Sequence, residues 1–258
     1  MAFLRSLFPK QLMLPYHLIL ALAGALWYRF PARSLTVIGV TGTKGKTTVS
    51  ELIAAILEEA GYSVALSNGV RFKIGRMPAE RNLTRMTMPG RFFLQRFLRK
   101  AVAAGCSHAV IEMTSEGAAQ HRHRFLSLDA LVFTNLAPEH IESHGSFKAY
   151  RDAKLSIARS LARSRKPNRI MVANSNDPAG ERFLATAAPA REAPFSLKDA
   201  EPYQILSDGL AFVFAGTPMR SPLRGQFNLS NILATVVLTS ALDVDVEVIK
   251  RAIESFAG

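Results

Sequence analysis

The stretch "VIGVTGTKGKTTVSELIAAILEEAG", residues 37–61, decides the fold of this chain. It opens with a β-branched apolar run of the kind that forms a buried parallel strand. Residues 49–61 then repeat apolar side chains at helical spacing and end in Gly61, which suits the position just after a helix. Between the two lies the glycine-rich "TGTKGKTT". The stretch therefore predicts a strand, a tight turn and a helix.

The turn has the composition of a phosphate-binding loop. Gly42 and Gly45 let the main chain approach an anion closely, and the start of the helix offers unpaired N–H groups. Lys46 adds a positive charge for the β- and γ-phosphates, and Thr47 a hydroxyl for Mg²⁺. The strict pattern G-x-x-x-x-G-K-[ST] requires glycine where this chain has Val40, so the loop is a variant. We interpret it as an ATP-binding loop, with a solvated surface turn as the alternative.

Composition narrows the class of protein to which this chain can belong and the partners that it can have. The 258 residues allow one or two domains, and 48% hydrophobic with 20% charged residues is typical of a folded protein. A single cysteine, Cys106, excludes a disulfide framework and fits a reducing cytoplasm. The net charge is +12, and residues 71–100 contain nine Lys or Arg and one acid. Three surroundings fit this basic arc: an anionic membrane, a polyphosphate substrate, and water around a face that has no partner. Without an RNA-binding or helix-turn-helix motif, we expect no nucleic-acid partner.

The N-terminal segment 11–28, "QLMLPYHLILALAGALWY", contains no Asp, Glu, Lys or Arg. A membrane-spanning helix needs about 20 apolar residues. Pro15 and His17 shorten the uninterrupted apolar stretch of this segment. A secretory signal would need a small-residue cleavage site, whereas "RFPARSLTV" runs directly into the first strand. Three interpretations stay open: a helix lying on a membrane or on the domain, a membrane span, and a signal peptide.

Strands and helices alternate along the rest of the chain. This order predicts a mostly parallel sheet with helices on both faces. Residues 201–223 alternate in polarity around "SDG" and predict a hairpin at the sheet edge. We expect strands at 35–40, 62–68, 71–76, 108–114, 128–136 and 168–177, and helices at 49–61, 90–105, 146–162, 228–244 and 245–256.

Polar residues come at the ends of several of the predicted strands. Ligands of such sheets bind beyond the carboxyl ends of the strands, where Thr41, Glu112 and Thr114 lie. An acid that ends an apolar strand requires a salt bridge or a cation, and both remain open for Glu112. His140 and Lys154 come after a neighbouring strand. Mg²⁺ prefers oxygen ligands and keeps several waters, so a carboxylate, the Thr47 hydroxyl and ATP oxygens would suffice to bind it.

Four motifs in order resemble the Mur ligases: "TGTKGKTT", "IEMTSEGAAQHR", "TNLAPEHIESHGSFKAYRDAK" and "GQFNLSNILA". The similarity covers residues 35–258 and is to the central, ATP-binding domain of that family, a P-loop NTPase-like α/β fold. Within the family the motifs are most similar to those of the UDP-N-acetylmuramoyl-tripeptide synthetases. The resemblance implies a carbon–nitrogen ligase of peptidoglycan precursor synthesis. Such an enzyme phosphorylates a muramoyl-peptide carboxylate with ATP and Mg²⁺, and an amino acid then displaces the phosphate.

The resemblance also implies the catalytic residues. Lys46 would hold the γ-phosphate, and Thr47 the Mg²⁺ between the β- and γ-phosphates. Glu112 and His140 would be metal ligands, with His140 serving a second ion. Lys154 matches the lysine that the family carbamylates, and as a carbamate it would anchor Mg²⁺ or its waters.

The same match implies further site positions. The ATP site would comprise Gly42, Thr43, Lys44, Gly45, Lys46, Thr47, Thr48, Asn228 and Asn231, with Asn231 the better candidate for contacting adenine. The muramoyl-peptide would be held by Thr87, Thr114, Ser115, Gln120 and Arg122. The chain departs from the family pattern at Lys44, usually asparagine, at Met88, usually threonine, and at Glu116, usually histidine. It departs also at Glu139 and Glu142, which are usually aspartates.

The resemblance predicts an unusual domain organisation. Residues 1–34 would be a hydrophobic segment, preceding a central domain at 35–258. The family's N-terminal uridine-nucleotide domain and C-terminal amino-acid domain would be absent, so we expect an incomplete ligase or one completed by a partner chain. We expect a cytoplasmic protein that contacts a membrane peripherally through residues 11–28. The alternatives are a folylpolyglutamate synthase-like enzyme, a lipid II amidating ligase subunit and a non-catalytic nucleotide-binding or membrane-scaffold module.

Overall fold

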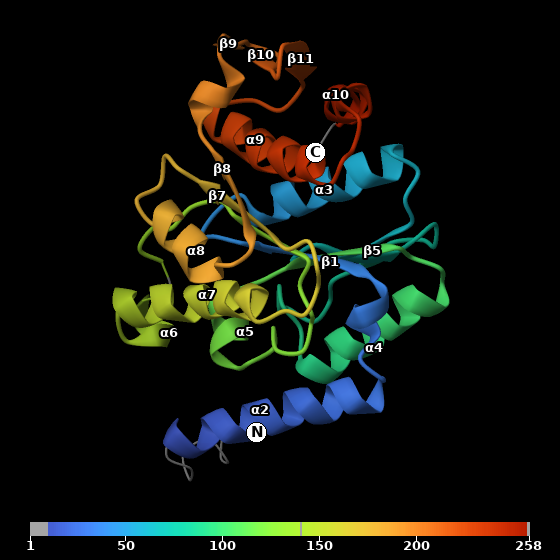
Figure 1. Cartoon of the computed structure of the whole chain (residues 1–258), viewed down its shortest axis with the longest axis vertical. Helices are drawn as coiled ribbons and strands as arrows, with labels where there is room; N and C mark the ends of the chain where they lie inside the picture. Colours follow the sequence, from blue (N-terminus) through green and yellow to red (C-terminus); the bar gives the residue numbers. More distant parts are fainter. Residues whose placement is uncertain (1–9, 140, 257–258) are drawn as a thin grey trace.

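A computed structural model describes residues 10–139 and 141–256. Its centre is an eight-stranded sheet in the order β4-β3-β2-β5-β1-β6-β7-β8 (Figure 1). The six strands from β2 to β8 in that order run parallel, whereas β3 pairs antiparallel with both β2 and β4, so the predicted mostly parallel sheet is confirmed. The strands span Thr36–Thr41 (β1), Val64–Ser67 (β2), Arg71–Ile74 (β3), Glu80–Arg81 (β4), His108–Glu112 (β5), Ala130–Phe133 (β6), Ile170–Asn174 (β7) and Arg191–Phe195 (β8).

Helices cover both faces of this sheet (Figure 1). One face packs against α3 (Lys46–Glu59), α9 (Gln226–Ala241) and α10 (Val246–Ser255). The other packs against α4 (Arg91–Ala103), α5 (Ser115–Ala119), α7 (Phe147–Ala162) and α8 (Gly180–Ala187), with α6 (Ile141–His144) beside α7. The interiors of the central strands are apolar because both of their faces are buried. In β1, Ile38 and Val40 join the first core, and Val37 joins the second.

The helix after the glycine-rich turn ends as its sequence predicts. Gly61 has φ of 86° and lies just beyond the end of α3. Its N–H donates to Glu58 O, and the N–H of Tyr62 donates to Leu57 O, each at 2.9 Å. This pair of bonds is a Schellman motif, which satisfies carbonyls at the helix end.

The predicted hairpin at the edge of the main sheet is wrong in its placement. Residues 203–221 form a separate antiparallel sheet of β9 (Tyr203–Ile205), β10 (Leu210–Phe214) and β11 (Thr217–Ser221). Phe212 and Met219 of this small sheet are buried in the core beside α9 and α10. The small sheet therefore packs an apolar face of its own against these helices. One edge of the main sheet is β8, where Pro194 is tolerated because an edge strand leaves one row of groups unpaired.

The N-terminal segment forms α2 (Lys10–Trp27), which lies against α4 on the outside of the domain (Figure 1). Ala21, Gly24 and Ala25 are buried, and these small residues permit close packing, with Phe92 opposite Gly24. Arg99 of α4 donates to Tyr28 O and Arg29 O and so satisfies carbonyls at the end of α2. A short helix, η1 (Pro31–Ser34), leads from there into β1. Within the described part of the chain, no helix is long and apolar enough to cross a membrane.

Four of the nine positive charges in the basic arc at 71–100 take part in hydrogen bonds or ion pairs within the protein. Arg71 pairs with Glu51 and Lys73 with Glu58. Arg91 donates to Gln120 O, and Arg99 holds the end of α2. These charges therefore stabilise contacts between elements.

The buried imidazole of His123 should make stability depend on pH. Burial, together with the charges of His121 and Arg124, lowers the pKa of His123 from 6.5 to about 3. The unfolded state consequently binds more protons between those two pH values, so stability is lost as the pH falls through that window. The slope for one such group is about 1.4 kcal/mol per pH unit.

The variant His123→Leu should remove this slope. Between pH 7 and about pH 4.5, its thermal unfolding midpoint should fall less than that of the wild type. Equal falls in the two proteins would mean that the imidazole is not held neutral in the fold.

Candidate functional site

The pairing of β1 with β5 and β6 brings predicted site residues together at the carboxyl ends of these strands. Val40 of β1 pairs with Glu112 of β5, and Thr41 pairs with Phe133 of β6. The loop after β1 is in close contact with the segment after β6, because a Cβ at Gly42 would lie 1.9 Å from Thr134 Oγ1. Gly42 is therefore required by close packing.

The segment after β6 fixes the main chain of the loop. Thr134 Oγ1 and Asn135 Nδ2 donate to Lys44 O, at 2.7 and 3.0 Å. The N–H of Lys44 donates to Asn135 Oδ1, and that of Thr43 to Asn135 O, both at 2.9 Å. These bonds hold the loop where α3 begins, and the first N–H groups of a helix have no partner within it. The loop and helix start together form a ready anion site.

Glu112 connects the loop to the adjacent strand. Its side chain is 3% exposed, and its Oε2 accepts hydrogen bonds from Thr47 Oγ1 and from the N–H of Gly69, each at 3.0 Å. Lys46 Nζ lies 4.0 Å from Oε1 and donates to Thr43 O at 2.9 Å. A carboxylate and a hydroxyl in contact are oxygen donors of the type that Mg²⁺ prefers, so these residues fit that ion. In residues 10–139 and 141–256, no three His, Cys, Asp or Glu side chains form a metal-binding group.

Lys154 approaches the same loop from α7. Its side chain is 2% exposed, its Nζ donates to Gly42 O at 2.6 Å, and it lies 4.9 Å from the centre of the Tyr150 ring. Burial, together with the charge of Lys46, lowers the pKa of Lys154 to about 7. The neutral amine of this residue is therefore accessible near neutral pH.

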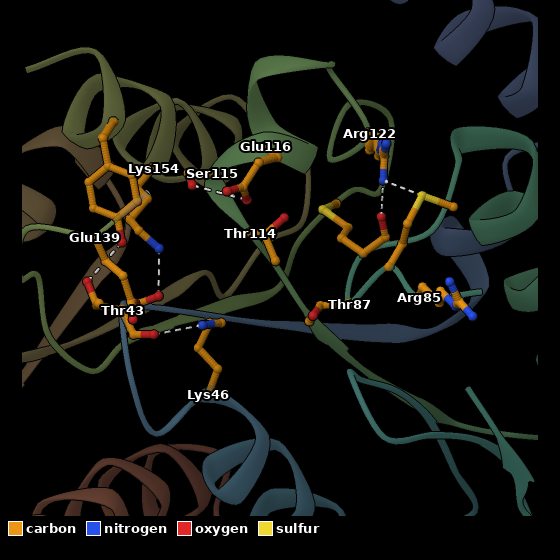
Figure 2. Close-up of a pocket in the computed structure, with 14 residues that line it drawn as sticks. Thr43, Lys46, Arg85, Thr87, Thr114, Ser115, Glu116, Arg122, Glu139 and Lys154 are labelled. Carbon is orange, nitrogen blue, oxygen red and sulfur yellow. Dashed lines mark hydrogen bonds between the residues drawn. The ribbon is translucent and has the colours of Figure 1, made fainter. Parts of the chain in front are cut away.

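A cavity of about 330 Å³ lies beside the loop. Figure 2 shows Lys46 and Lys154 at one end and Arg85 and Arg122 at the other. The cavity brings together eight of the predicted site residues, Gly42, Thr43, Lys46, Thr87, Thr114, Ser115, Arg122 and Lys154. It therefore has one cationic end at the glycine-rich loop and a second cationic end opposite.

Other cavity residues had no assigned role in the sequence. Arg85 and Tyr150 line it, as do Glu116 and Glu139, which differ from the family pattern. The hydroxyl groups of Tyr150 and Thr43 lie 2.9 Å apart. Arg85 has φ of 56°, a left-handed backbone that no sequence pattern indicated.

Contacts position the residues at the second cationic end. Arg122 donates to Met88 O, and to Gln120 Oε1 at 2.8 Å, so Gln120 contacts Arg122 and does not line the cavity. Thr114 caps α5, accepting the N–H of Gly117 at 3.1 Å. This end of the cavity is thus built from the start of α5, the segment after α5 and the segment preceding α4.

The remaining predicted site residues do not line the cavity. Asn231 packs behind the loop, where a Cβ at Gly45 would lie 2.2 Å from its Oδ1, and it donates to Asn228 Oδ1 at 3.1 Å. Lys44, Thr47, Thr48 and Glu112 adjoin the loop without lining the cavity. His140 lies outside the described residues.

Comparisons with known proteins agree with this fold. Residues 40–239 match the Mur ligase middle domain. The chain is 35% identical over 243 residues to the UDP-N-acetylmuramoyl-L-alanyl-D-glutamate–2,6-diaminopimelate ligase of Gloeobacter violaceus, covering 90% of this chain and 47% of the relative. It is 34% identical over 257 residues to a UDP-N-acetylmuramyl-tripeptide synthetase of a Roseiflexus species, covering 93% and 50%. The chain thus spans about half the length of these curated relatives.

Solved structures show the same fold. A UDP-N-acetylmuramoyl-L-alanyl-D-glutamate–2,6-diaminopimelate ligase superimposes with a TM-score of 0.74 at 24% identity, over 87% of this chain and 47% of the other. The UDP-N-acetylmuramoylalanyl-D-glutamyl-2,6-diaminopimelate–D-alanyl-D-alanyl ligase of Acinetobacter baumannii gives 0.71 at 20% identity, over 94% and 50%. By the match over residues 40–239, the chain belongs to the Mur ligase family and contains its middle domain.

Proposed function

We propose that this chain is the ATP-binding core of an amide-forming ligase that activates a muramoyl-peptide carboxylate. The observation that carries the proposal is the cavity with two cationic ends, Lys46 and Lys154 at the phosphate-binding loop and Arg85 with Arg122 opposite. One end suits the terminal phosphate of ATP, and the other a carboxylate or phosphate of the substrate. The names of the relatives supply the substrate class, a UDP-N-acetylmuramoyl peptide.

The reaction proceeds in two displacements. A carboxylate oxygen of the substrate attacks the γ-phosphorus, the bond to the β-phosphate oxygen breaks, and ADP leaves. The amine of an amino acid then attacks the acyl carbon, loses a proton and releases phosphate. For the first step, Lys46 leaves Thr43 O and pairs with the γ-phosphate, while the N–H groups at the start of α3 bind the neighbouring oxygens.

Mg²⁺ fits beside Thr47 and Glu112, where it would offset the charge of the β- and γ-phosphates. Glu112 is suited to this role because the N–H of Gly69 fixes one of its oxygens and little of the side chain meets solvent. We propose His140 as a further ligand on the family resemblance alone. Asn231, with Asn228, remains the proposed adenine contact, and its place behind Gly45 puts it next to the loop.

We propose that Lys154 acts as a carbamate. The neutral amine combines with CO₂ to give an N-carboxylate and a proton, which turns a cation into an anion. The lowered pKa of Lys154 favours the neutral amine. The modification would also remove a repulsion between two cations, because Lys46 is the nearby charge that disfavours the protonated form of Lys154.

The competing functions differ in the acid that they activate. A folylpolyglutamate synthase-like enzyme would use a folate, a lipid II amidating subunit would use a lipid-linked peptide, and a non-catalytic module would use none. Contact of residues 11–28 with a membrane is a separate proposal, because it depends on surfaces away from this cavity.

The chain should form an acyl phosphate from Mg-ATP and UDP-N-acetylmuramoyl-L-alanyl-D-glutamate. Hydroxylamine traps such an intermediate as a hydroxamate, which reports the first displacement without the amino acid. Lys46→Ala should reduce hydroxamate formation roughly ten- to hundred-fold, since a hydrogen bond to a charged group contributes about 1.5–3 kcal/mol. Calorimetry should show weaker Mg-ATP binding in the same variant.

A matched control is Lys198→Ala, which removes an exposed lysine of the short helix η2 (Leu197–Ala200), away from the cavity. It should match the wild type. Hydroxamate formation with tetrahydrofolate, and none with the muramoyl-peptide, would favour the folylpolyglutamate synthase-like alternative. ATP binding with no substrate-dependent hydroxamate would refute the ligase proposal.

The carbamate should be visible directly. In ¹³C-bicarbonate, the wild type should show a protein-bound carbamate resonance by NMR that increases as the pH rises through about 7, because the neutral amine forms above the pKa. The variant Lys154→Ala should lack it, and a short carboxylic acid should restore part of that variant's hydroxamate formation. A wild type without the resonance, or a fully active Lys154→Ala at limiting bicarbonate, would contradict the proposal.

A further inference from the structure

A second cavity, of about 670 Å³, lies at the amino ends of the strands, next to α2. It is bordered by α2, by η1, by the loop before β6 and by the end of α7. Two of its lining residues hold buried polar atoms that have no hydrogen-bond partner in the described part of the chain, His123 Nδ1 and Ser160 Oγ. The lining contains no Asp or Glu and five cationic residues, Arg33, Arg124, Arg163, Arg165 and Lys166.

Most of these charges are not neutralised by the protein. Lys166 pairs with Asp129 at 3.2 Å. Within residues 10–139 and 141–256, the guanidinium groups of Arg124, Arg163 and Arg165 form no hydrogen bond or ion pair. Burial, together with the charge of Arg163, lowers the pKa of Arg124. An anion bound among them would relieve this repulsion, and arginine is well suited to phosphate.

An apolar surface adjoins the cavity. The outer face of α2 exposes Ile19, Leu22, Leu26 and Trp27, with Trp27 77% and Ile19 64% exposed. Leu22 belongs both to this face and to the cavity lining. Residues 15–27 contain no Asp, Glu, Lys or Arg, and Arg29 comes two residues later. The face is held outward because the opposite side of α2 packs on α4 and Arg99 binds the helix end.

We propose that α2 and this cationic cavity together bind the surface of an anionic phospholipid bilayer. The apolar face lies at the level of the first acyl carbons, parallel to the membrane, while the cavity accepts lipid phosphate groups. Interfacial helices bind in this way through buried apolar area together with attraction to anionic lipids. Each charge near such a surface strengthens the attraction, and salt weakens it.

A bilayer fits these surfaces better than a second copy of the chain. A copy would bring a net charge of +12 toward a cluster that is already cationic, and like charges oppose association. An anionic bilayer offers hydrocarbon and phosphate side by side, which matches the adjacent apolar face and cavity. The proposal does not depend on the catalytic function, because no residue of the cavity at the phosphate-binding loop takes part.

Vesicle co-sedimentation of the whole chain tests the proposal. The wild type should bind vesicles of phosphatidylcholine with phosphatidylglycerol, and bind pure phosphatidylcholine roughly tenfold or more weakly. Arg163→Gln with Arg165→Gln should lower binding to the anionic vesicles roughly tenfold. Ile19→Glu with Leu26→Glu should lower binding to both kinds of vesicle. All four side chains are exposed, so folding should be retained, which unchanged thermal unfolding would verify.

Matched controls lie on the far side of the molecule. Lys198→Gln with Arg220→Gln removes the same charge, and Ile205→Glu places one acid at an exposed apolar position of β9; both should bind vesicles like the wild type. Equal binding of every variant, or no preference for anionic vesicles, would overturn the proposal. So would a concentration-dependent dimer in analytical ultracentrifugation that Ile19→Glu with Leu26→Glu dissociates, because the face would then be an interface between copies.

Discussion

The buried carboxylate of Glu112 joins the elements on which the site depends. It ends β5, accepts hydrogen bonds from Thr47 of α3 and from the N–H of Gly69 after β2, and faces Lys46. An acid at 3% exposure is costly unless it is paired or binds a cation. Its contacts therefore fix where α3 begins relative to the central strands. They also leave a carboxylate and a hydroxyl beside the loop, the oxygen donors that a magnesium–nucleotide complex requires.

The parts of the fold that the sequence predicts well are those governed by neighbouring residues. The strand, turn and helix at 36–59 result from local periodicity and glycine, and the sheet results from alternating elements. Placement of the segment 203–221 could not be predicted, because an alternating pattern does not reveal which sheet a strand joins. Arg85, Glu139 and Tyr150 come from three separate segments, and only the folded chain brings them to one cavity.

The two ends of the parallel strands present different chemistry. At the carboxyl ends, cations surround a loop and a helix start that suit a phosphate chain. At the amino ends, arginines border an apolar helix that suits a lipid surface. Under the two proposals, the basic character of the chain is divided between two anion-binding surfaces, the first of which includes Arg85 of the 71–100 arc. Arg71, Lys73 and Arg99 of the same arc stabilise internal contacts. If both proposals hold, the chain would carry out its chemistry beside the membrane.

A crystal structure of the chain with Mg²⁺ and a non-hydrolysable ATP analogue tests the central claim most directly. The account predicts a triphosphate along residues 42–47, with Lys46 Nζ moved from Thr43 O to the terminal phosphate and Mg²⁺ beside Thr47 and Glu112. A nucleotide bound elsewhere, with Lys46 still on Thr43 O and the Thr47–Glu112 hydrogen bond intact, would contradict it.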